Sequence, residues 1–515
     1  MTATYATPGI YVEEVSTLPP SVVETGTAIP AFIGYTLTKP GTGSEPVCLE
    51  VNSLHEYEEH FGKTLPLEGI LTKTNSGFSF TIKSVLAASA GSVSPTFSAS
   101  SASSAGLSAS TTSSGSASSA GSSGSSGSTA AADATAPTGS PASTGSAELT
   151  EFSEPDFYLW YAIDHYFRNG GGRCYVISVG TMGSKGINAN ELKGGIARLE
   201  REDEPTLIII PDANGLVEVE KYDVYQAAII QAAKLKDRFA ILDLDPIDNV
   251  GKYDKNQTKN FRNGVSLTES QLSYSATYAP ALKSSISYLI NDKLITIEGA
   301  KLDDLQNTDT SLYNQAIKFM GTFRLILPPS AAVAGAITSV DGTRGVWKAP
   351  ANVPLQSVIA PVYNFTDEEQ AELNIDNSGK SINIIRSFPG RGNLIWGART
   401  MAGNSNEWRY VSVRRLFAAV EENINKASAF AVFEPNDIST WLKVKGMIDS
   451  YLYSLWQRGA LQGASAEEAY FVDIGLGKTM TQTDVNEGRM IIVIGLAATR
   501  PAEFIIIRFS HKQAA

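Results

Sequence analysis

The sequence has few of the residues that carry most catalytic and metal chemistry. Its 515 residues include only two cysteines, Cys48 and Cys174, and four histidines. Cysteines so far apart form neither a disulfide framework nor a Cys-x-x-Cys motif, and no cluster of histidine, cysteine and acidic residues has the spacing of metal ligands. We therefore expect no metal, no cofactor and folding in a reducing cytoplasm.

Long apolar runs and positive charge are also scarce. The longest apolar stretch, residues 490–498, is far shorter than the roughly 20 residues that a membrane-spanning helix needs. Residues 1–10 lack the basic and apolar regions of a signal peptide. The net charge of −12 disfavours nucleic-acid binding, because phosphate contacts need a basic surface. We expect a chain that neither inserts into a membrane nor contacts nucleic acid directly.

Two patterns suggest enzyme chemistry, and both are incomplete. Residues 475–479, Gly-Leu-Gly-Lys-Thr, resemble the end of a phosphate-binding loop, but Val472 occupies the position of the motif's first glycine. Ser330 is the candidate nucleophile of a serine hydrolase, but no partner for it is identifiable. Such a site needs a histidine base, and His165 lies in a predicted helix beside aromatic residues. We expect no enzyme activity, and a hydrolase is kept as an alternative.

Composition divides the chain before any motif is considered. Residues 84–147 consist almost entirely of Ser, Ala, Gly, Thr and Pro, and such a segment cannot bury enough apolar surface to offset the entropy of ordering it. We interpret it as a surface insertion, either a passive linker or an adhesive or modified tract. After it, helices alternate with apolar strands, which predicts a parallel sheet covered on both faces. The predicted helices are 157–167, 191–201 and 222–236, and the predicted strands are 174–179, 206–210, 239–244 and 323–327.

The pattern changes from residue 408 onward. Apolar residues at helical spacing over 413–424 predict a helix whose other face, including Arg414 and Arg415, is polar. A second helix is predicted over 437–457, and strands are predicted over 489–496 and 503–509. Together these elements indicate an α+β C-terminal domain.

Several motifs resemble, in this order, those of the tail sheath family shared by contractile phages, R-type pyocins and extracellular contractile injection systems. They are PGIYVEEV (8–15), AIPAFIGY (28–35), FRNGG (167–171), PPSAAVAG (328–335), GVWKAPA (345–351), WGART (396–400), WRYV (408–411) with RRL (414–416), VFEPN (432–436) and PAEF (501–504). Each motif is short, but together they extend over nearly the whole chain outside the insertion.

The resemblance implies a fold and a division of the chain. The core is expected to be a subtilisin-like but non-catalytic α/β domain with a parallel sheet, followed by an α+β domain, with terminal arms that exchange strands between subunits. The expected parts are an N-terminal arm (1–20), the first part of the core (21–83), the insertion (84–147), the main core (148–400) and the C-terminal assembly domain with its strand arm (401–515).

The resemblance also implies a function. Such subunits polymerise as stacked hexameric rings around an inner tube, and contract from a metastable extended state to drive the tube through a target membrane. The expected partners are other copies of the chain, the tube protein, and baseplate and terminator or cap proteins. The sheath is assembled in the bacterial cytoplasm as part of a phage tail or a phage-tail-like particle. A non-contractile structural or adhesive surface protein is the other alternative.

Two groups of residues are assigned to assembly. The terminal segments are β-prone and apolar, and an exposed edge of this kind favours pairing with another chain; the arm residues are Ile10, Tyr11, Val12, Glu13, Val15, Glu503, Phe504, Ile505, Ile506, Ile507, Arg508 and Phe509. The resemblance implies that a C-terminal helix contacts the tube, with Lys443, Lys445 and Arg458 as candidates. Residues two apart on a helix point in different directions, so at most one of Lys443 and Lys445 faces the tube.

Overall fold

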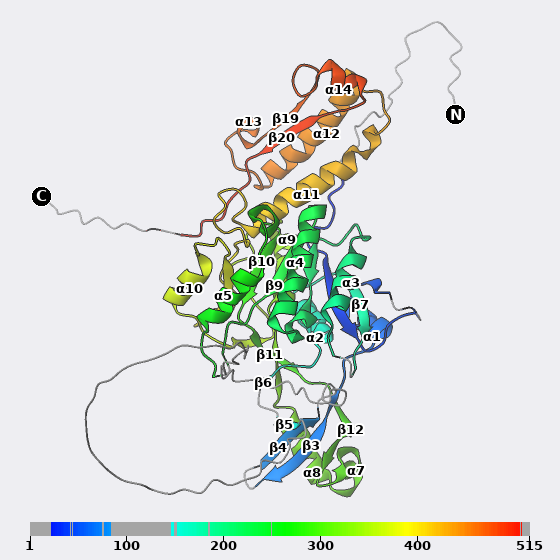
Figure 1. Cartoon of the computed structure of the whole chain (residues 1–515), viewed down its shortest axis with the longest axis vertical. Helices are drawn as coiled ribbons and strands as arrows, with labels where there is room; N and C mark the ends of the chain where they lie inside the picture. The colour runs from blue at the N-terminus through cyan, green and yellow to red at the C-terminus, as the bar shows by residue number, and fades with distance from the viewer. Residues whose placement is uncertain are drawn as a thin grey trace, which may run out of the picture.

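The computed structural model describes residues 22–504 and 506, apart from residues 42, 44, 75–76, 84–145, 149–151, 184–185, 249 and 505. The molecule extends along one axis. A large sheet lies in the middle, a small lobe of strands and two helices lies at one end, and a mainly helical C-terminal part lies at the other end (Figure 1). No helix in the part described combines the length and apolarity needed to cross a membrane.

A nine-stranded sheet forms the centre of the molecule, in the order β15-β18-β17-β10-β9-β8-β1-β7-β2. The six strands from β17 to β7 run parallel to their neighbours, and antiparallel strands complete both edges. The predicted α/β architecture with a parallel sheet is therefore confirmed. The strands are β1 (Pro30–Thr36), β2 (Val47–Val51), β7 (Cys174–Thr181), β8 (Leu207–Ile209), β9 (Phe239–Asp243), β10 (Ser275–Ala279), β15 (Val353–Pro354), β17 (Ile382–Phe388) and β18 (Gly392–Ile395).

Helices cover both faces of this sheet. Alternate residues of a strand point to opposite faces, so Phe32 of β1 lies in one apolar cluster with α2 and α9, and Ala31 and Ile33 lie in a second cluster with α3 and α4. Apolar residues at consecutive positions of β1 are therefore buried on both faces of the sheet. The helices around the sheet are α1 (Leu54–Phe61), α2 (Leu159–Arg168), α3 (Ala189–Leu199), α4 (Glu218–Leu235), α5 (Lys255–Gly264), α6 (Glu269–Leu272), α9 (Ser330–Arg344) and α10 (Asp367–Asn374).

A buried carboxylate connects three of these elements. Asp212 lies in a 3-10 turn, η2 (Pro211–Gly215), directly after β8. Its side chain accepts hydrogen bonds from the backbone N–H groups of Tyr35 in β1 at 2.7 Å, and of Tyr158 and Leu159 at the start of α2 at 2.6 and 3.1 Å. Tyr158 is the N-cap of α2 and supplies no side-chain cap of its own, so Asp212 provides the acceptors that this helix end needs.

Asp212→Ala is expected to lower the free energy of unfolding by about 3 kcal/mol, because it leaves buried N–H groups without acceptors. The urea midpoint, followed by tryptophan fluorescence, measures this loss. Asp223→Ala is the control, since Asp223 forms only an exposed ion pair with Lys193 and should cost less than about 1 kcal/mol. An Asp212→Ala midpoint equal to that of the control would show that the three hydrogen bonds contribute little.

A small lobe, which no local sequence pattern predicts, is built from segments that are far apart in the sequence. Its sheet has the order β13-β12-β3-β4-β5 and is covered by α7 and α8. Lys83 at the end of β4 pairs with Ser146 in β5, so residues 84–145 leave and return at neighbouring strands. The elements are β3 (Leu67–Thr74), β4 (Gly77–Lys83), β5 (Ser146–Glu148), β12 (Ile290–Ile297), β13 (Ala300–Lys301), α7 (Leu302–Thr308) and α8 (Thr310–Met320).

A four-stranded sheet in the order β16-β11-β14-β6 completes the central part of the molecule. Its strands are β6 (Phe152–Ser153), β11 (Leu282–Ser287), β14 (Arg324–Leu327) and β16 (Val358–Pro361). Strand β14, which was predicted over 323–327, leads through Pro328 and Pro329 into α9.

The C-terminal part has a core of its own, formed mainly between its two long helices and a two-stranded sheet. Helices predicted at 413–424 and 437–457 are present, and the strand predicted over 489–496 is the shorter β20. Of the strand predicted over 503–509, residues 503, 504 and 506 are described and belong to no strand. The elements are α11 (Val411–Ser428), η3 (Ala429–Ala431), α12 (Ile438–Gln457), α13 (Ala466–Ala469), β19 (Tyr470–Ile474), α14 (Gln482–Asn486) and β20 (Ile492–Leu496).

One sequence expectation about α11 is wrong. Arg414 and Arg415, which the helical pattern placed on the polar face, are both buried. The guanidinium of Arg414 lies between the rings of Tyr274 and Trp408, 4.4 and 4.2 Å from their centroids. The first turns of α11 pack against the central part as well as against the C-terminal part, so both of their faces are covered. Tyr274 and Trp408 stack on Arg414, and Asp341 neutralises Arg415.

Candidate functional site: the arm roots and the domain junction

Ser330, the candidate nucleophile of the hydrolase alternative, is hydrogen bonded to a buried aspartate. Ser330 begins α9, and its Oγ donates to Asp243 Oδ2 at 2.7 Å while its backbone N donates to Oδ1 at 2.7 Å. Both residues are buried, and burial raises the pKa of Asp243. Asn214 donates to the same carboxylate at 3.3 Å. The serine hydroxyl therefore donates to Asp243 at the end of β9 and links this strand to α9, and none of the histidines among the described residues bonds to it.

His165 has a different place in the molecule. Its Nε2 lies 3.3 Å from the carbonyl oxygen of Gln356, and its Nδ1 has no hydrogen-bond partner. The side chain is fully buried, and burial lowers the pKa of the imidazole from 6.5 to about 4. Within the described residues, no three or more His, Cys, Asp and Glu side chains are grouped to hold a metal ion. His165 is a core residue of α2 that stays neutral above pH 5.

This burial predicts a pH effect on stability. The unfolded chain binds a proton at His165 near pH 6.5, whereas the folded chain binds it only near pH 4, so stability falls as the pH decreases between these values. The loss at pH 4 should approach about 3 kcal/mol. We expect the difference in unfolding free energy between wild type and His165→Gln to shrink by this amount from pH 7 to pH 4. His60→Gln, at an exposed position, should follow the wild-type profile; a pH-independent difference for His165→Gln would contradict the assignment.

The N-terminal arm root, residues 22–27, lies along the C-terminal part before the chain enters β1. Val22 packs against the apolar core of that part. Glu24 forms an ion pair with Arg458 at the end of α12, with Oε2 3.2 Å from Nη1. Thr25 donates from its backbone N at 2.9 Å and from its Oγ1 at 2.8 Å to Asn423 of α11. The root is thus held by both long helices of the C-terminal part.

A buried ion pair joins this root to the junction between the two parts. Arg415 of α11 donates to Asp341 of α9 at 2.6 and 3.2 Å, and its Nη2 donates to the carbonyl oxygen of Thr27 at 2.9 Å. Thr27 Oγ1 donates to the same aspartate at 2.6 Å. The side chains of Arg415 and Asp341 are only 3% and 6% exposed. One buried ion pair therefore connects α9, α11 and the segment at Thr27, which are far apart in the sequence.

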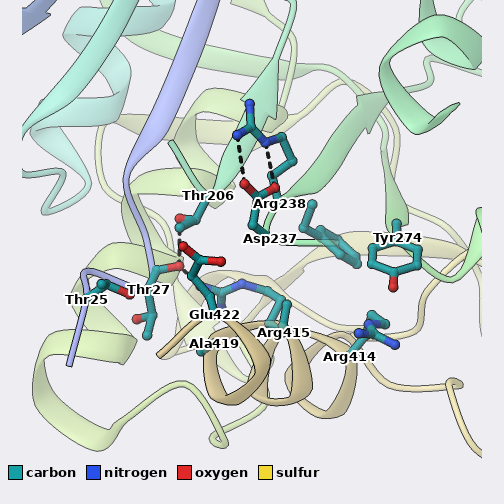
Figure 2. Close-up of a pocket in the computed structure, with 12 residues that line it drawn as sticks. Thr25, Thr27, Thr206, Asp237, Arg238, Tyr274, Arg414, Arg415, Ala419 and Glu422 are labelled. Carbon is teal, nitrogen blue, oxygen red and sulfur yellow. Dashed lines mark hydrogen bonds and ion pairs between the residues drawn. The ribbon is translucent and has the colours of Figure 1, made fainter. Parts of the chain in front are cut away.

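Figure 2 shows the small cavity beside this pair, where Thr25 and Thr27 of the entering segment face Arg415 and Glu422 of α11. Its volume of about 20 Å³ is enough for about one water molecule. The cavity is therefore part of a packed junction, and it is too small for an organic ligand.

The C-terminal arm root, residues 497–503, crosses from β20 back to the central part. Glu503 receives hydrogen bonds from Arg399 Nε at 2.9 Å and Arg399 Nη2 at 2.7 Å, from Asn374 at 2.9 Å and from Tyr410 at 3.2 Å. Burial opposes ionisation, but the bonds from Arg399 and Asn374 lower the pKa of Glu503. We call these four residues the C-terminal clasp.

The other predicted arm residues fall mainly outside the description. Residues 10–15, 505 and 507–509 lie outside the described residues, while Phe504 and Ile506 are 66% and 78% exposed. Glu503 bonds within its own chain, and Phe504 follows it directly into solvent. Of the predicted arm residues that are described, Glu503 is therefore held within the subunit, whereas Phe504 and Ile506 are exposed to solvent.

The three tube-facing candidates differ in their surroundings. Lys443 is exposed on α12, and Lys445 is half-buried. Arg458 is engaged with Glu24, and its guanidinium lies 5.3 Å from the ring centroid of Trp347. Of these candidates, Lys443 is more exposed than Lys445, and Arg458 is already paired with Glu24.

The two-stranded sheet β19–β20 is the feature most suited to assembly. Tyr470 to Ile474 pair with Leu496 to Ile492 in antiparallel register, and no third described strand joins this sheet. Phe471 and Val493 are exposed although both are large and apolar. Among the described residues, the outer edges of β19 and β20 are not paired with another strand, and open edges with exposed apolar side chains favour the addition of strands from other chains.

Comparison with known proteins identifies the family. A model described as the phage tail sheath protein central domain matches residues 187–401, and one described as the phage tail sheath C-terminal domain matches residues 404–512. The chain belongs to the phage tail sheath family. The tail sheath protein of Vibrio phage KVP40 is 31% identical over 136 residues, which are 26% of this chain and 20% of the phage protein. That of Enterobacteria phage T4 is 23% identical over 154 residues, 30% of this chain and 22% of the phage protein. The matches thus span about a fifth of these relatives' length.

Solved sheath structures match along nearly the entire chain. The sheath of the PVC extracellular contractile injection system in its contracted state has 28% identity and a TM-score of 0.60, with 99% of each chain covered. The contracted helical sheath of the anti-feeding prophage has 29% identity and a TM-score of 0.60, with 99% of this chain and 100% of that chain covered. These relatives are structural sheath proteins and not enzymes, so the prediction of a structural tail sheath protein is confirmed.

Some residues of the sheath motifs form ion pairs with residues that are distant in the sequence. Arg399 lies in the motif at 396–400 and Glu503 in the motif at 501–504, and together they form the clasp, although they are 104 positions apart. Arg415 lies in the motif at 414–416 and pairs with Asp341, just beyond the motif at 328–335. Sequence reasoning missed both pairs, because a lone arginine or acid gives no signal of a partner so far away.

Proposed function

We propose that this sheath protein polymerises as stacked hexameric rings around an inner tube, and contracts from a metastable extended state to drive the tube through a target membrane. The observation that carries the proposal is the β19–β20 sheet, whose edges are open within the described residues. It belongs to a chain whose two ends are β-prone segments beyond well-anchored roots. The fold that holds these roots is similar to sheaths described as contracted, from the PVC system and the anti-feeding prophage.

Strand exchange supplies the links between subunits. The terminal arms, with residues 10–15 and 504–509, add strands to the sheets of neighbouring copies. Each added strand forms about six backbone hydrogen bonds, worth roughly 1 kcal/mol each. Because the arms extend beyond anchored roots, subunit bodies repack during contraction while the arms keep them linked.

Contraction in this scheme requires no nucleotide. The extended polymer is kinetically trapped during assembly, and triggering lets it relax to a more stable packing. The partial phosphate-loop motif at 475–479 lies between β19 and β20, where Gly475 and Thr479 hydrogen bond with each other in a tight turn. Its residues form a turn after β19, in the segment that leads through α14 to β20.

Further partners follow from the particle. The subunit contacts other copies of itself, the tube protein, and baseplate and terminator or cap proteins; a relative of 29% identity and TM-score 0.59 occurs in the baseplate structure of the anti-feeding prophage. The tube contact is assigned to α12, where Lys443 offers an exposed charge. Assembly takes place in the bacterial cytoplasm, into a phage tail or a phage-tail-like particle. A subtilisin-like, non-catalytic fold of the core is also part of the proposal.

Negative-stain microscopy of the purified chain with its tube protein tests this function. Long cylinders should form, and on mild acid or urea they should shorten and widen without added nucleotide. Cylinders that never change length would support a non-contractile structural protein. A chain that stays monomeric with its arms intact would instead support an adhesive surface protein, with the insertion between β4 and β5 as the adhesive tract.

A further inference from the structure

The C-terminal clasp surrounds a charge that would be costly to leave unpaired. The guanidinium of Arg399 is 5% exposed, and Glu503 is its ion-pair partner. Removing one member of a buried pair leaves an uncompensated charge, which is strongly destabilising. The clasp therefore holds Glu503 far more firmly than an exposed ion pair would.

The clasp also gathers groups from three separate elements onto one carboxylate. Asn374 ends α10, Arg399 follows β18, and Tyr410 is the N-cap of α11. Both oxygens of Glu503 are used, one by Asn374 and Arg399 and the other by Arg399 and Tyr410. Such a set fixes the position and the direction of the side chain, and with it the backbone at residue 503.

The chain changes from bound to exposed within one residue of the clasp. Before it, the backbone N–H of Thr499 donates to the carbonyl oxygen of Ala460, and that of Gln462 donates to Ala497. These two bonds hold the root against the C-terminal part. After it, Phe504 and Ile506 are largely exposed. Tension applied to the arm would therefore act on the central part through Arg399 before it could separate β20 from its five pairs with β19.

Among the described residues, the ion pair nearest the start of the N-terminal root is more exposed than the Arg399–Glu503 pair. Its outermost ion pair joins Glu24 to Arg458, and these side chains are 45% and 42% exposed. Exposed pairs of this kind are weak. The buried Arg415–Asp341 pair contacts the root only at Thr27, three residues after Glu24. The two roots are thus unequal, and the C-terminal root is the firmer one.

We propose that Glu503 is the positioning residue of the C-terminal arm: bound to Arg399, Asn374 and Tyr410, it fixes where and in which direction the arm leaves the subunit for a neighbouring copy. This rests on the proposed strand exchange between copies. An anchored root lowers the entropy lost when the arm is captured, and it carries load from the arm into the central sheet.

A spin label at Ala502→Cys, an exposed position beside Glu503, reports the mobility of the root. Burial raises the pKa of the native thiols of Cys48 and Cys174, so they should react slowly with the label. The label is compared in wild type, in Glu503→Gln, and in the double variant Arg399→Met with Glu503→Leu. The double variant removes both charges and leaves no buried ion unpaired. Glu407→Gln is the control, because Glu407 is an exposed acid that precedes Tyr410 in the sequence and belongs to none of the clasp's hydrogen bonds.

We expect the double variant to melt near the wild-type temperature, to show a more mobile label, and to need a concentration of subunit about tenfold higher to form cylinders on the tube. Glu503→Gln should lie between the two, and Glu407→Gln should match wild type. An unchanged label spectrum, or cylinders at the wild-type concentration, would overturn the positioning role. Failure of the wild-type chain itself to form cylinders would instead overturn the proposed function and its strand exchange.

Discussion

Deletion of residues 1–17 is expected to leave a folded monomer that no longer forms long polymers. The contacts that hold the body together among the described residues begin at Val22 and Glu24, so the truncation removes none of them. It does remove the strand that, in the proposed assembly, each subunit adds to its neighbour, with about six hydrogen bonds of roughly 1 kcal/mol each. A loss of about 6 kcal/mol corresponds to about 10⁴ in the association constant.

Light scattering and negative-stain microscopy measure this effect. The matched control replaces residues 90–140 of the insertion with a short Gly-Ser linker. Because β4 and β5 pair beside each other where the insertion leaves and returns, this variant should keep its fold and still assemble. Normal cylinders from the truncated chain would contradict the role of the N-terminal arm.

Arg415→Ala is expected to lower the free energy of unfolding by about 3–5 kcal/mol, because it leaves Asp341 buried without a counter-charge. It also removes the hydrogen bond to Thr27 that holds the N-terminal root. The double variant Arg415→Met with Asp341→Leu should regain most of the loss, since it replaces the pair by apolar side chains of similar size.

Urea unfolding followed by tryptophan fluorescence compares these variants. Lys234→Ala is the control, because it breaks the exposed pair with Glu200 and should cost less than about 1 kcal/mol. If Arg415→Ala unfolds at the same midpoint as Lys234→Ala, the buried pair does not stabilise the junction.

The parts of the fold that sequence predicted are those that local pattern determines. Apolar residues at all positions of β8, and at all positions of β9 except its last, Asp243, indicated burial on both faces. The sequence pattern over 437–457 indicated α12. The lobe was missed because its strands are rich in Thr, Ser and Lys and are separated by the insertion. No local pattern shows that β12, more than 200 positions after β3, pairs with it.

The candidate site was the least predictable feature, because long-range pairs form it. Helical periodicity placed Arg415 in solvent, since a charge on a helix face is usually solvated. Its partner Asp341 lies 74 positions away, and only the packing of α11 against α9 brings them together. Glu503 was likewise assigned to the free arm from its β-prone surroundings, whereas Arg399 holds it in the body of the subunit.

A helical reconstruction of the polymer on its tube is the most direct test of strand exchange between copies. The account predicts a four-stranded sheet, in which β19 and β20 are joined by residues 10–15 of one neighbouring copy and residues 504–509 of another. A polymer in which β19–β20 remains two-stranded, with both arms folded onto their own subunit, would contradict it.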